Sequence, residues 1–188
     1  ILKFQEKTEL HITFFQGTKD FTSGSGTSSI SVVDNSLHDE RSISTFEVDQ
    51  NKFISLEHFI LYQKCLTVRD IERANSVLSV KDSTKLCAID EGIEQLSEEL
   101  LSLWDMKAHY NALLEGIRLK FHPHSYLREQ LLMTYPRPLA KLSMADDESG
   151  IGLDLDQQGV DDLHEWGANL LGMALQIARN EFRYQSEI

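Results

Sequence analysis

The sequence contains no apolar stretch near the roughly 20 residues that a helix needs to cross a bilayer. Its N-terminal residues also lack the succession of charged, apolar and small residues typical of a secretory signal peptide. Only two cysteines, Cys65 and Cys87, occur among 188 residues, which excludes a disulfide framework. Both lie in apolar or helical stretches, where reduced core thiols are usual. We therefore expect a soluble protein without membrane contact, in the reducing cytoplasm.

Basic residues are also scarce, because 18 Lys and Arg stand against 30 Asp and Glu, a formal net charge of −12. A negative field of this size repels phosphate backbones, so extended duplex binding is not expected. A small anionic ligand in a locally basic pocket remains compatible with it. Nothing indicates a metal or a cofactor: His122 and His124 have no third ligand nearby, and no Walker or dinucleotide pattern is present.

What is present predicts one helix-rich α+β domain over residues 1–188, with a small sheet near the N-terminus and no repeats. Ser55 is the expected N-cap of a helix that carries Glu57 in its first turn. The other expected elements are a strand at Leu10 to Phe15, a hairpin at Phe46 to Phe53, a strand at Leu139 to Leu142, helices at about 68–78, 96–104, 113–121, 127–132 and 170–177, and a loop at 79–88.

The stretch from Thr22 to Thr45 is more than half Ser, Thr and Gly. Such a composition is typical of a flexible linker, and a loop of this length is commonly either functional or disordered. We expect residues 22–45 to form a flexible insertion at the surface of the domain.

Glu57 and Lys64 stand seven residues apart on one expected helix, so both side chains lie on the same face. A solvated ion pair on an amphipathic helix is one interpretation. The other is a pocket in which the carboxylate serves as acid or base beside an amine of tunable pKa. A lysine that is desolvated can lose its proton and attack a carbonyl carbon. The pattern leaves both interpretations open.

A second candidate region is the acidic run that begins at Asp146 and leads into Gly150-Ile151-Gly152. Acidic runs are usually solvated loops, yet glycines allow a ligand to approach the backbone closely. Trp166 and Asn169 stand at an expected helix start, which can bind anions, and an indole can stack on a base or a ribose. For Trp104 and Trp166, core packing is the alternative.

The order of several short motifs resembles the NADAR family, from about Ile12 to Arg179. The matching residues are Phe14-Phe15, Phe46-Glu47-Val48, Ser55-Leu56-Glu57-His58, Gln63-Lys64, Trp104 with Lys107, Lys120-Phe121, Leu131-Leu132-Met133-Thr134, Asp146 with Gly150-Ile151-Gly152, and Trp166-Gly167-Ala168-Asn169-Leu170-Leu171-Gly172. The sequence departs from the family pattern at Ser149, where the family has Trp, and near Gly24, where it has Asn.

The resemblance implies a compact α+β fold and N-glycosidase chemistry on a bond between a ribose C1 and a nitrogen. Substrates of that kind are ADP-ribose attached to guanine and ribosylamino-pyrimidine phosphates. Glu57 and Asp146 would be the catalytic carboxylates, and Lys64 the amine that captures the opened sugar as a Schiff base. The implied substrate-binding residues are Phe15, Trp104, Gly150, Gly152, Trp166 and Asn169.

The chemistry of these residues agrees with that activity, because a carboxylate stabilises positive charge at C1 and an acid assists the departing nitrogen. A competing hypothesis is a non-catalytic module that binds ADP-ribose or a related nucleotide, since the missing Trp and Asn remove substrate contacts. A third is a scaffold module that uses the Ser-rich insertion.

Overall fold

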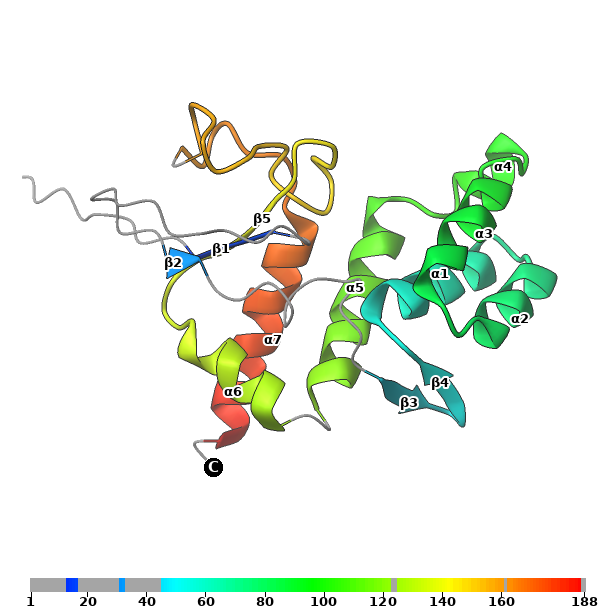
Figure 1. Cartoon of the computed structure of the whole chain (residues 1–188), viewed down its shortest axis with the longest axis horizontal. Coiled ribbons are helices and arrows are strands. Elements are labelled where there is room, and N and C mark those ends of the chain that lie inside the picture. The colour runs from blue at the N-terminus through cyan, green and yellow to red at the C-terminus, as the bar shows by residue number, and fades with distance from the viewer. Residues whose placement is uncertain (1–12, 17–30, 33–44, 123–124, 161, 187–188) are drawn as a thin grey trace, which may run out of the picture.

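The computed structural model describes residues 13–16, 31–32, 45–122, 125–160 and 162–186. Its elements, in chain order, are β1 (Thr13–Gln16), β2 (Ser31–Val32), β3 (Phe46–Val48), β4 (Asn51–Phe53), α1 (Leu56–Thr67), α2 (Ile71–Ser79), the 3-10 turn η2 (Ser83–Lys85), α3 (Leu86–Ile93), α4 (Glu98–Leu101), α5 (Met106–Phe121), α6 (Ser125–Met133), β5 (Leu139–Leu142) and α7 (Leu170–Ser186). The expected helix-rich α+β fold is confirmed (Figure 1).

Two small sheets flank the helices. In one, β1 pairs in parallel with both β2 and β5, and Thr13 stands opposite Leu139. The sheet near the N-terminus is therefore completed by a strand from the second half of the chain. In the other, β3 and β4 form the predicted hairpin, whose turn residues Asp49 and Gln50 have φ of 49° and 69°. Positive φ at both positions matches the twist of a two-residue hairpin turn.

The predicted N-cap of α1 is confirmed, because the Ser55 hydroxyl accepts a hydrogen bond from the backbone N–H of His58 at 3.1 Å. The next helix begins later than expected, at Ile71. Its N-cap is Asp70, whose carboxylate accepts from the Arg73 N–H, while Arg69 with φ of 62° ends the preceding helix. A side-chain cap decides this boundary, and the apolar periodicity does not show it.

Two other expectations about helices are wrong in detail. The expected loop at 79–88 contains η2 and the start of α3, because Asp82 accepts the Thr84 N–H and begins a new helical turn. The expected helix at 96–104 is reduced to the four residues of α4. The leucines at its end bring Trp104 toward the core, where it packs against two apolar clusters.

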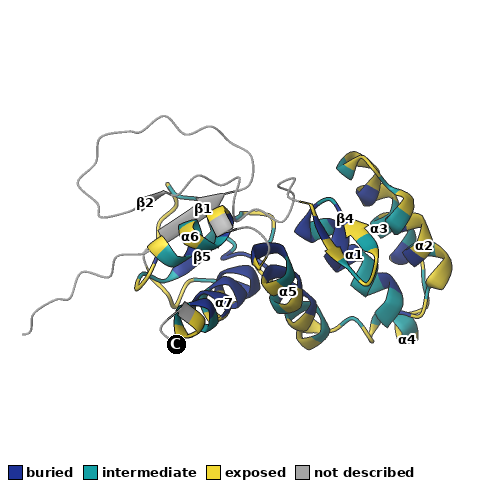
Figure 2. Cartoon of the chain, turned by 90° about the horizontal axis from the view of Figure 1, so that it is seen from below, coloured by how far each residue is buried: buried dark blue, intermediate teal, exposed yellow. Residues whose placement is uncertain are grey.

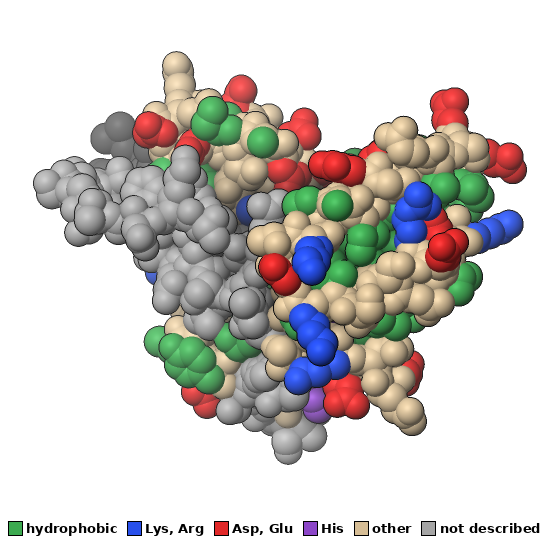
Figure 3. Space-filling view, turned by 45° about the vertical axis from the view of Figure 1, so that its right-hand side comes forward, with side chains coloured by type: hydrophobic (Ala, Val, Ile, Leu, Met, Phe, Trp, Pro, Cys, Tyr) green, Lys and Arg blue, Asp and Glu red, His purple; other side chains and the backbone are tan. Residues whose placement is uncertain are grey.

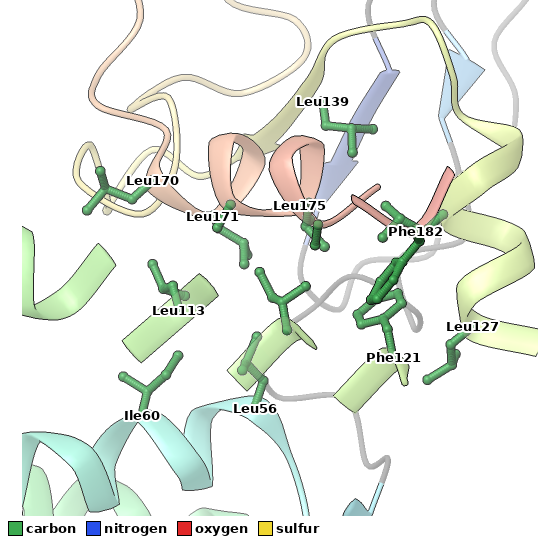
Figure 4. Packing of buried hydrophobic residues seen from close by; sticks show 14 residues of the cluster. Leu56, Ile60, Leu113, Phe121, Leu127, Leu139, Leu170, Leu171, Leu175 and Phe182 are labelled. Carbon is green, nitrogen blue, oxygen red and sulfur yellow. The ribbon is translucent and has the colours of Figure 1, made fainter. Parts of the chain in front are cut away.

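The main core lies where α1, α5 and α7 pack together (Figures 2 and 4). Gly116 allows α5 to approach α1 closely, because a Cβ at this position would lie 2.4 Å from Leu56 Cδ1 and 2.8 Å from Phe59 Cδ1. The side chains of this core are Leu56, Ile60, Leu113, Ile117, Phe121, Leu127, Leu131, Leu139, Leu170, Leu171, Ala174, Leu175, Ala178 and Phe182. Burial of so many large apolar groups, at about 25 cal/mol per Å², fixes the positions of the three helices.

Polar side chains join the remaining segments to this core. His58 is fully buried, and it accepts the Ile54 N–H at Nδ1 and donates from Nε2 to the Val77 carbonyl at 2.7 Å. Burial lowers the pKa of His58, which favours this neutral form. Arg179 on α7 donates to Thr134 and to the Arg137 carbonyl, and so holds the segment between α6 and β5.

Some predictions fall on residues outside the described ranges. Most of the expected insertion at 22–45 lies there, except β2 and Thr45, and so do Leu10 to Ile12 and His124. Within the described ranges, no helix is both long and apolar enough to cross a bilayer.

Candidate functional site

A cavity of about 440 Å³ opens between α1, α3 and the start of α5. Its size falls in the range that is usual for small-molecule sites. The residues that line it are Glu57, Ile60, Leu61, Lys64, Leu86, Cys87, Asp90, Glu91, Glu94, Trp104, His109 and Ser149. Three of the predicted site residues therefore line the same cavity: Glu57, Lys64 and Trp104.

The face of α1 positions Glu57 and Lys64 as their spacing predicts. Both side chains line the cavity, together with Ile60 and Leu61, which stand between them in the helix. The opposite side of the helix is buried against the hairpin through Phe59. The interpretation as a merely solvated side chain does not hold for Lys64, which is only 14% exposed and lines the cavity.

Lys64 is bound by two acidic side chains that the sequence analysis did not select. Its Nζ lies 2.7 Å from Asp90 Oδ1 and 2.7 Å from Glu94 Oε1. Burial by itself lowers the pKa of Lys64, but the hydrogen bonds and charges of Asp90 and Glu94 outweigh burial and raise the pKa above its ordinary value. The amine is therefore held as an ammonium, and it becomes nucleophilic only after these two contacts are released.

Asp90 and Glu94 were missed because residues 79–88 were assigned to a loop and no element was assigned to the stretch between that loop and the helix expected at about 96–104. The two acids stand four residues apart, at the end of α3 and just beyond it, with Ile93 buried beside them. That i, i+4 spacing is the pattern in the sequence from which they could have been found.

Trp104, His109 and Ser149 also line the cavity. Trp104 and the His109 ring are 5.5 Å apart between centroids and tilted by 32°. The Nδ1 atom of His109 lies 2.6 Å from Glu148 Oε1, which ties the start of α5 to the 146–149 turn. Ser149 is buried and occupies the position at which the family pattern has Trp, so the cavity is bounded there by a hydroxymethyl group.

Asp146 does not line this cavity. Its carboxylate binds Lys141 Nζ at 2.9 Å and accepts the backbone N–H groups of Glu148 and Ser149. Burial raises the pKa of Asp146, but Lys141 and the two N–H groups outweigh burial and hold the pKa below its ordinary value. Asp146 is thus the residue that shapes the turn carrying Ser149 into the cavity wall.

The expected anion site at the start of α7 is not available. The backbone N–H groups of Ala168, Leu170 and Leu171 donate to the carbonyls of residues 147, 148 and 149, at 2.6, 3.0 and 3.1 Å. A helix start binds anions only through N–H groups that lack hydrogen-bond partners. Here the carbonyl groups of the 146–149 turn already accept hydrogen bonds from these N–H groups.

The other predicted substrate-binding residues surround this turn and lie outside the cavity lining. Asn169 donates to the Leu139 carbonyl and accepts the Lys141 N–H, which joins β5 to α7. The indole of Trp166 donates to the Val160 carbonyl at 3.0 Å. The two glycines complete the turn: Gly150 is buried close to the carbonyl of residue 141, and Gly152 has φ of 73°.

Phe15 lies in β1, opposite Lys141 in the parallel register, and its side chain is outside what the structure describes. The two cysteines are unpaired, with Cys65 buried and Cys87 exposed at the cavity. Burial raises the pKa of Cys65 to about 11, as expected of an inert core thiol.

Comparison with known proteins gives a consistent result. A family model, the NADAR domain, matches residues 4–183. Protein irg-1 of Caenorhabditis elegans is 31% identical over 140 residues, which cover 72% of this chain and 64% of that protein, slightly less than two thirds of its length. N-glycosidase R617 of Acanthamoeba polyphaga mimivirus is 27% identical over 131 residues, which cover 69% of this chain and 75% of that protein.

The fold has a solved counterpart in the NMR structure of the Escherichia coli protein YbiA. The TM-score is 0.65, and the superposition covers 96% of this chain and 92% of that chain at 19% sequence identity. A likeness at this identity concerns the fold alone. The family model, in contrast, spans nearly the whole sequence and includes every motif around the cavity. The chain belongs to the NADAR family.

Proposed function

We propose that this chain is an N-glycosidase that hydrolyses the bond between a ribosyl C1 and a nitrogen of a small-molecule or nucleotide substrate. The observation that carries the proposal is the cavity in which Glu57 and Lys64, from one face of α1, stand with the indole of Trp104. The name of the viral relative, an N-glycosidase at 27% identity, supports the same chemistry.

In this mechanism Glu57 supplies the negative charge. Breaking a ribosyl–nitrogen bond builds positive charge at C1, and a carboxylate in a partly enclosed site stabilises that charge much better than water does. Glu57 is only partly exposed and lines the cavity, so it can lie beside the sugar. Trp104 offers an aromatic face for the base or the ribose.

The 146–149 turn defines the far wall of the same site. Asp146 acts through this turn, because its carboxylate fixes the N–H groups of Glu148 and Ser149. The Ser149 side chain is smaller than the indole that the family pattern has at this position, so we propose that the site accepts a larger group here than relatives with Trp accept. ADP-ribose attached to guanine is the preferred candidate, and a ribosylamino-pyrimidine phosphate is the second.

The direct experiment is an end-point assay of base release. The folded chain is incubated with ADP-ribosylated guanosine, with a short ADP-ribosylated single strand, and with a ribosylamino-pyrimidine phosphate. Release of the free base or free amine from at least one of them is expected. If none is cleaved by a folded chain that binds ADP-ribose in calorimetry, the second candidate function, a non-catalytic nucleotide-binding module, replaces the first. Ser149 and the altered wall favour that second candidate.

Lys64 gives a separate prediction about the sugar. After the ring opens, the C1 aldehyde and the neutral amine can condense to an imine with loss of water, and borohydride reduces the imine to a stable secondary amine. Because Asp90 and Glu94 raise the pKa of Lys64, the amine stays protonated up to higher pH, and trapping by ADP-ribose should increase as pH rises. In the double variant Asp90→Asn, Glu94→Gln, the two charges that raise the pKa of Lys64 are removed and burial, which lowers this pKa, remains. The adduct between Lys64 and ADP-ribose should therefore form from a lower pH upward.

Mass spectrometry of the reduced chain measures the adduct. Lys64→Ala should form none, whereas Lys81→Ala, which alters an exposed lysine outside the cavity, should match the unaltered chain. An equal adduct in Lys64→Ala would exclude the lysine route and leave the carboxylate route.

For cellular location, we propose the reducing cytoplasm, on the evidence of the unpaired cysteines Cys65 and Cys87.

A further inference from the structure

His109 and Glu148 are brought together from distant parts of the sequence at the wall of the cavity. His109 stands in the first turn of α5, and Glu148 belongs to the 146–149 turn. The distance from His109 Nδ1 to Glu148 Oε1 is 2.6 Å, while His109 itself lines the cavity. The histidine side chain is 15% exposed and the carboxylate 47% exposed. The imidazole thus lies between a carboxylate on one side and the cavity on the other.

The pairing decides which ring nitrogen carries the proton. An ionised carboxylate only accepts hydrogen bonds, so Nδ1 must be the donor to Glu148. The second ring nitrogen, Nε2, has no hydrogen-bond partner among the residues that the structure describes. It is consequently an acceptor in the neutral ring and a donor in the protonated ring. An unengaged nitrogen on a ring in the wall of a cavity is suited to exchange a proton with a bound molecule.

The ring is also held in place. Asp105 caps α5 by accepting the Ala108 N–H, and the His109 N–H donates to the Asp105 carbonyl at 2.9 Å. Trp104 lies against the imidazole at 5.5 Å between ring centroids. Asp146 fixes the turn from which Glu148 reaches His109. A group held from three directions loses little freedom when it transfers a proton, which is the condition for efficient general acid catalysis.

We infer that His109, oriented by Glu148, is the general acid that protonates the departing nitrogen. The inference rests on the proposed N-glycosidase function and adds the acid that this function requires. As the C1–N bond breaks, its electron pair stays on the nitrogen, which takes the proton from Nε2. A water oxygen bonds to C1 and releases its proton to Glu57. Solvent then reprotonates Nε2 and deprotonates Glu57, so the net reaction consumes one water.

This assignment identifies the class of substrate. A leaving group that departs as a basic or anionic nitrogen, such as a purine or an aromatic amine, requires a proton. The other charged groups that line the cavity are carboxylates together with one ammonium. They are Glu57 and Lys64 on α1, Asp90 and Glu91 on α3, and Glu94 just after α3. Lys64 is engaged by Asp90 and Glu94, whereas the Nε2 atom of His109 has no described acidic partner and can pass a proton to a bound molecule.

The test is chemical rescue of His109→Ala on ADP-ribosylated guanosine. The variant should lose roughly 100- to 10,000-fold in kcat, the usual contribution of a general acid. Added imidazole should restore part of the rate in proportion to the concentration of its protonated form, because the deleted side chain leaves space for it. His109→Gln, which fills the space and cannot titrate, should be slow and not rescued. Asn111→Ala, at an exposed position of the same helix, is the matched control and should keep full activity.

A pH profile provides the second measurement. The unaltered chain should lose kcat as pH rises and the acid is deprotonated, and this limb should be absent in His109→Gln. If His109 only holds the 146–149 turn, imidazole will not rescue His109→Ala and the shape of the profile will not change, which would overturn the inference while the glycosidase proposal stands. If the unaltered chain cleaves no N-ribosyl substrate, both the proposed function and this inference are overturned.

Discussion

Replacing Glu57 with glutamine is expected to reduce kcat for ribosyl–nitrogen cleavage by roughly 100- to 1,000-fold, the cost that is typical of removing one group that stabilises charge in the transition state. Glutamine keeps the shape and the hydrogen-bonding reach of glutamate but removes the negative charge beside C1. Glu57 occupies the first turn of α1, where the side chain enters the cavity and the backbone is held by the Ser55 cap, so the helix should remain intact.

The measurement is kcat on the substrate that the unaltered chain cleaves fastest, together with calorimetry of ADP-ribose binding. Binding by Glu57→Gln should be within a few-fold of the unaltered chain, because the proposed role of the charge is specific to the transition state. Glu72→Gln removes an exposed charge from α2 and serves as the control. Full activity in Glu57→Gln would exclude this carboxylate from the reaction and require another source of negative charge in the cavity.

Replacing Gly167 with alanine is expected to destabilise the fold by about 3 kcal/mol, at the upper end of the usual cost of overpacking. A Cβ at Gly167 would lie 2.2 Å from the backbone oxygen of residue 147 and 2.8 Å from its Cα. These are backbone atoms that cannot rotate away as a side-chain tip can. Either the 146–149 turn or the segment before α7 must therefore move, and the hydrogen bonds between them lengthen.

Urea unfolding, with the midpoint and slope compared to the unaltered chain, measures this loss. Activity should fall as well, because the displaced turn carries Ser149 and Glu148 at the cavity wall. Gly92→Ala is the matched control: its Cβ would meet only the flexible end of the Arg73 side chain, at 3.0 Å, and alanine favours the helix. Unchanged stability of Gly167→Ala would mean that the contact between the turn and the segment before α7 is not close in solution.

The distribution of charge on the surface bears on which substrates can approach. Acidic and basic side chains are intermixed on the face shown in Figure 3, and acidic groups are prominent along its upper edge. Together with the net charge of −12, this favours a small or short substrate over a long duplex. A comparison of the short ADP-ribosylated single strand with the free nucleoside, in the assay proposed above, examines the same point.

The sequence predicted those structural features that depend on interactions between residues close together in the chain. The Ser55 cap, the hairpin at Phe46 to Phe53 and the terminal helix from Leu170 all depend on side chains within one turn or one strand of each other. Glu57 and Lys64 belong to the same class, because a separation of seven residues places two side chains on one helical face whatever packs against it.

Contacts between distant segments were not predictable in this way. Lys64 meets Asp90 and Glu94 only because α1 and α3 pack together, and these acids reverse the effect that burial alone has on the pKa of the lysine. Asp146, grouped with Glu57 from the family resemblance, instead forms the turn that presents Ser149. The start of α7 binds the carbonyls of this turn in place of an anion.

The sequence by itself determined the helix-rich fold, the family, and the shared face of Glu57 and Lys64, because periodicity, caps and ordered motifs act over short separations. Only the tertiary structure decided which side chains meet at the cavity. The pairing of His109 with Glu148, 39 residues apart, is the clearest example. Such pairs follow from how α5 and the 146–149 turn dock onto α7, and that docking depends on core packing and backbone hydrogen bonds that no local pattern encodes.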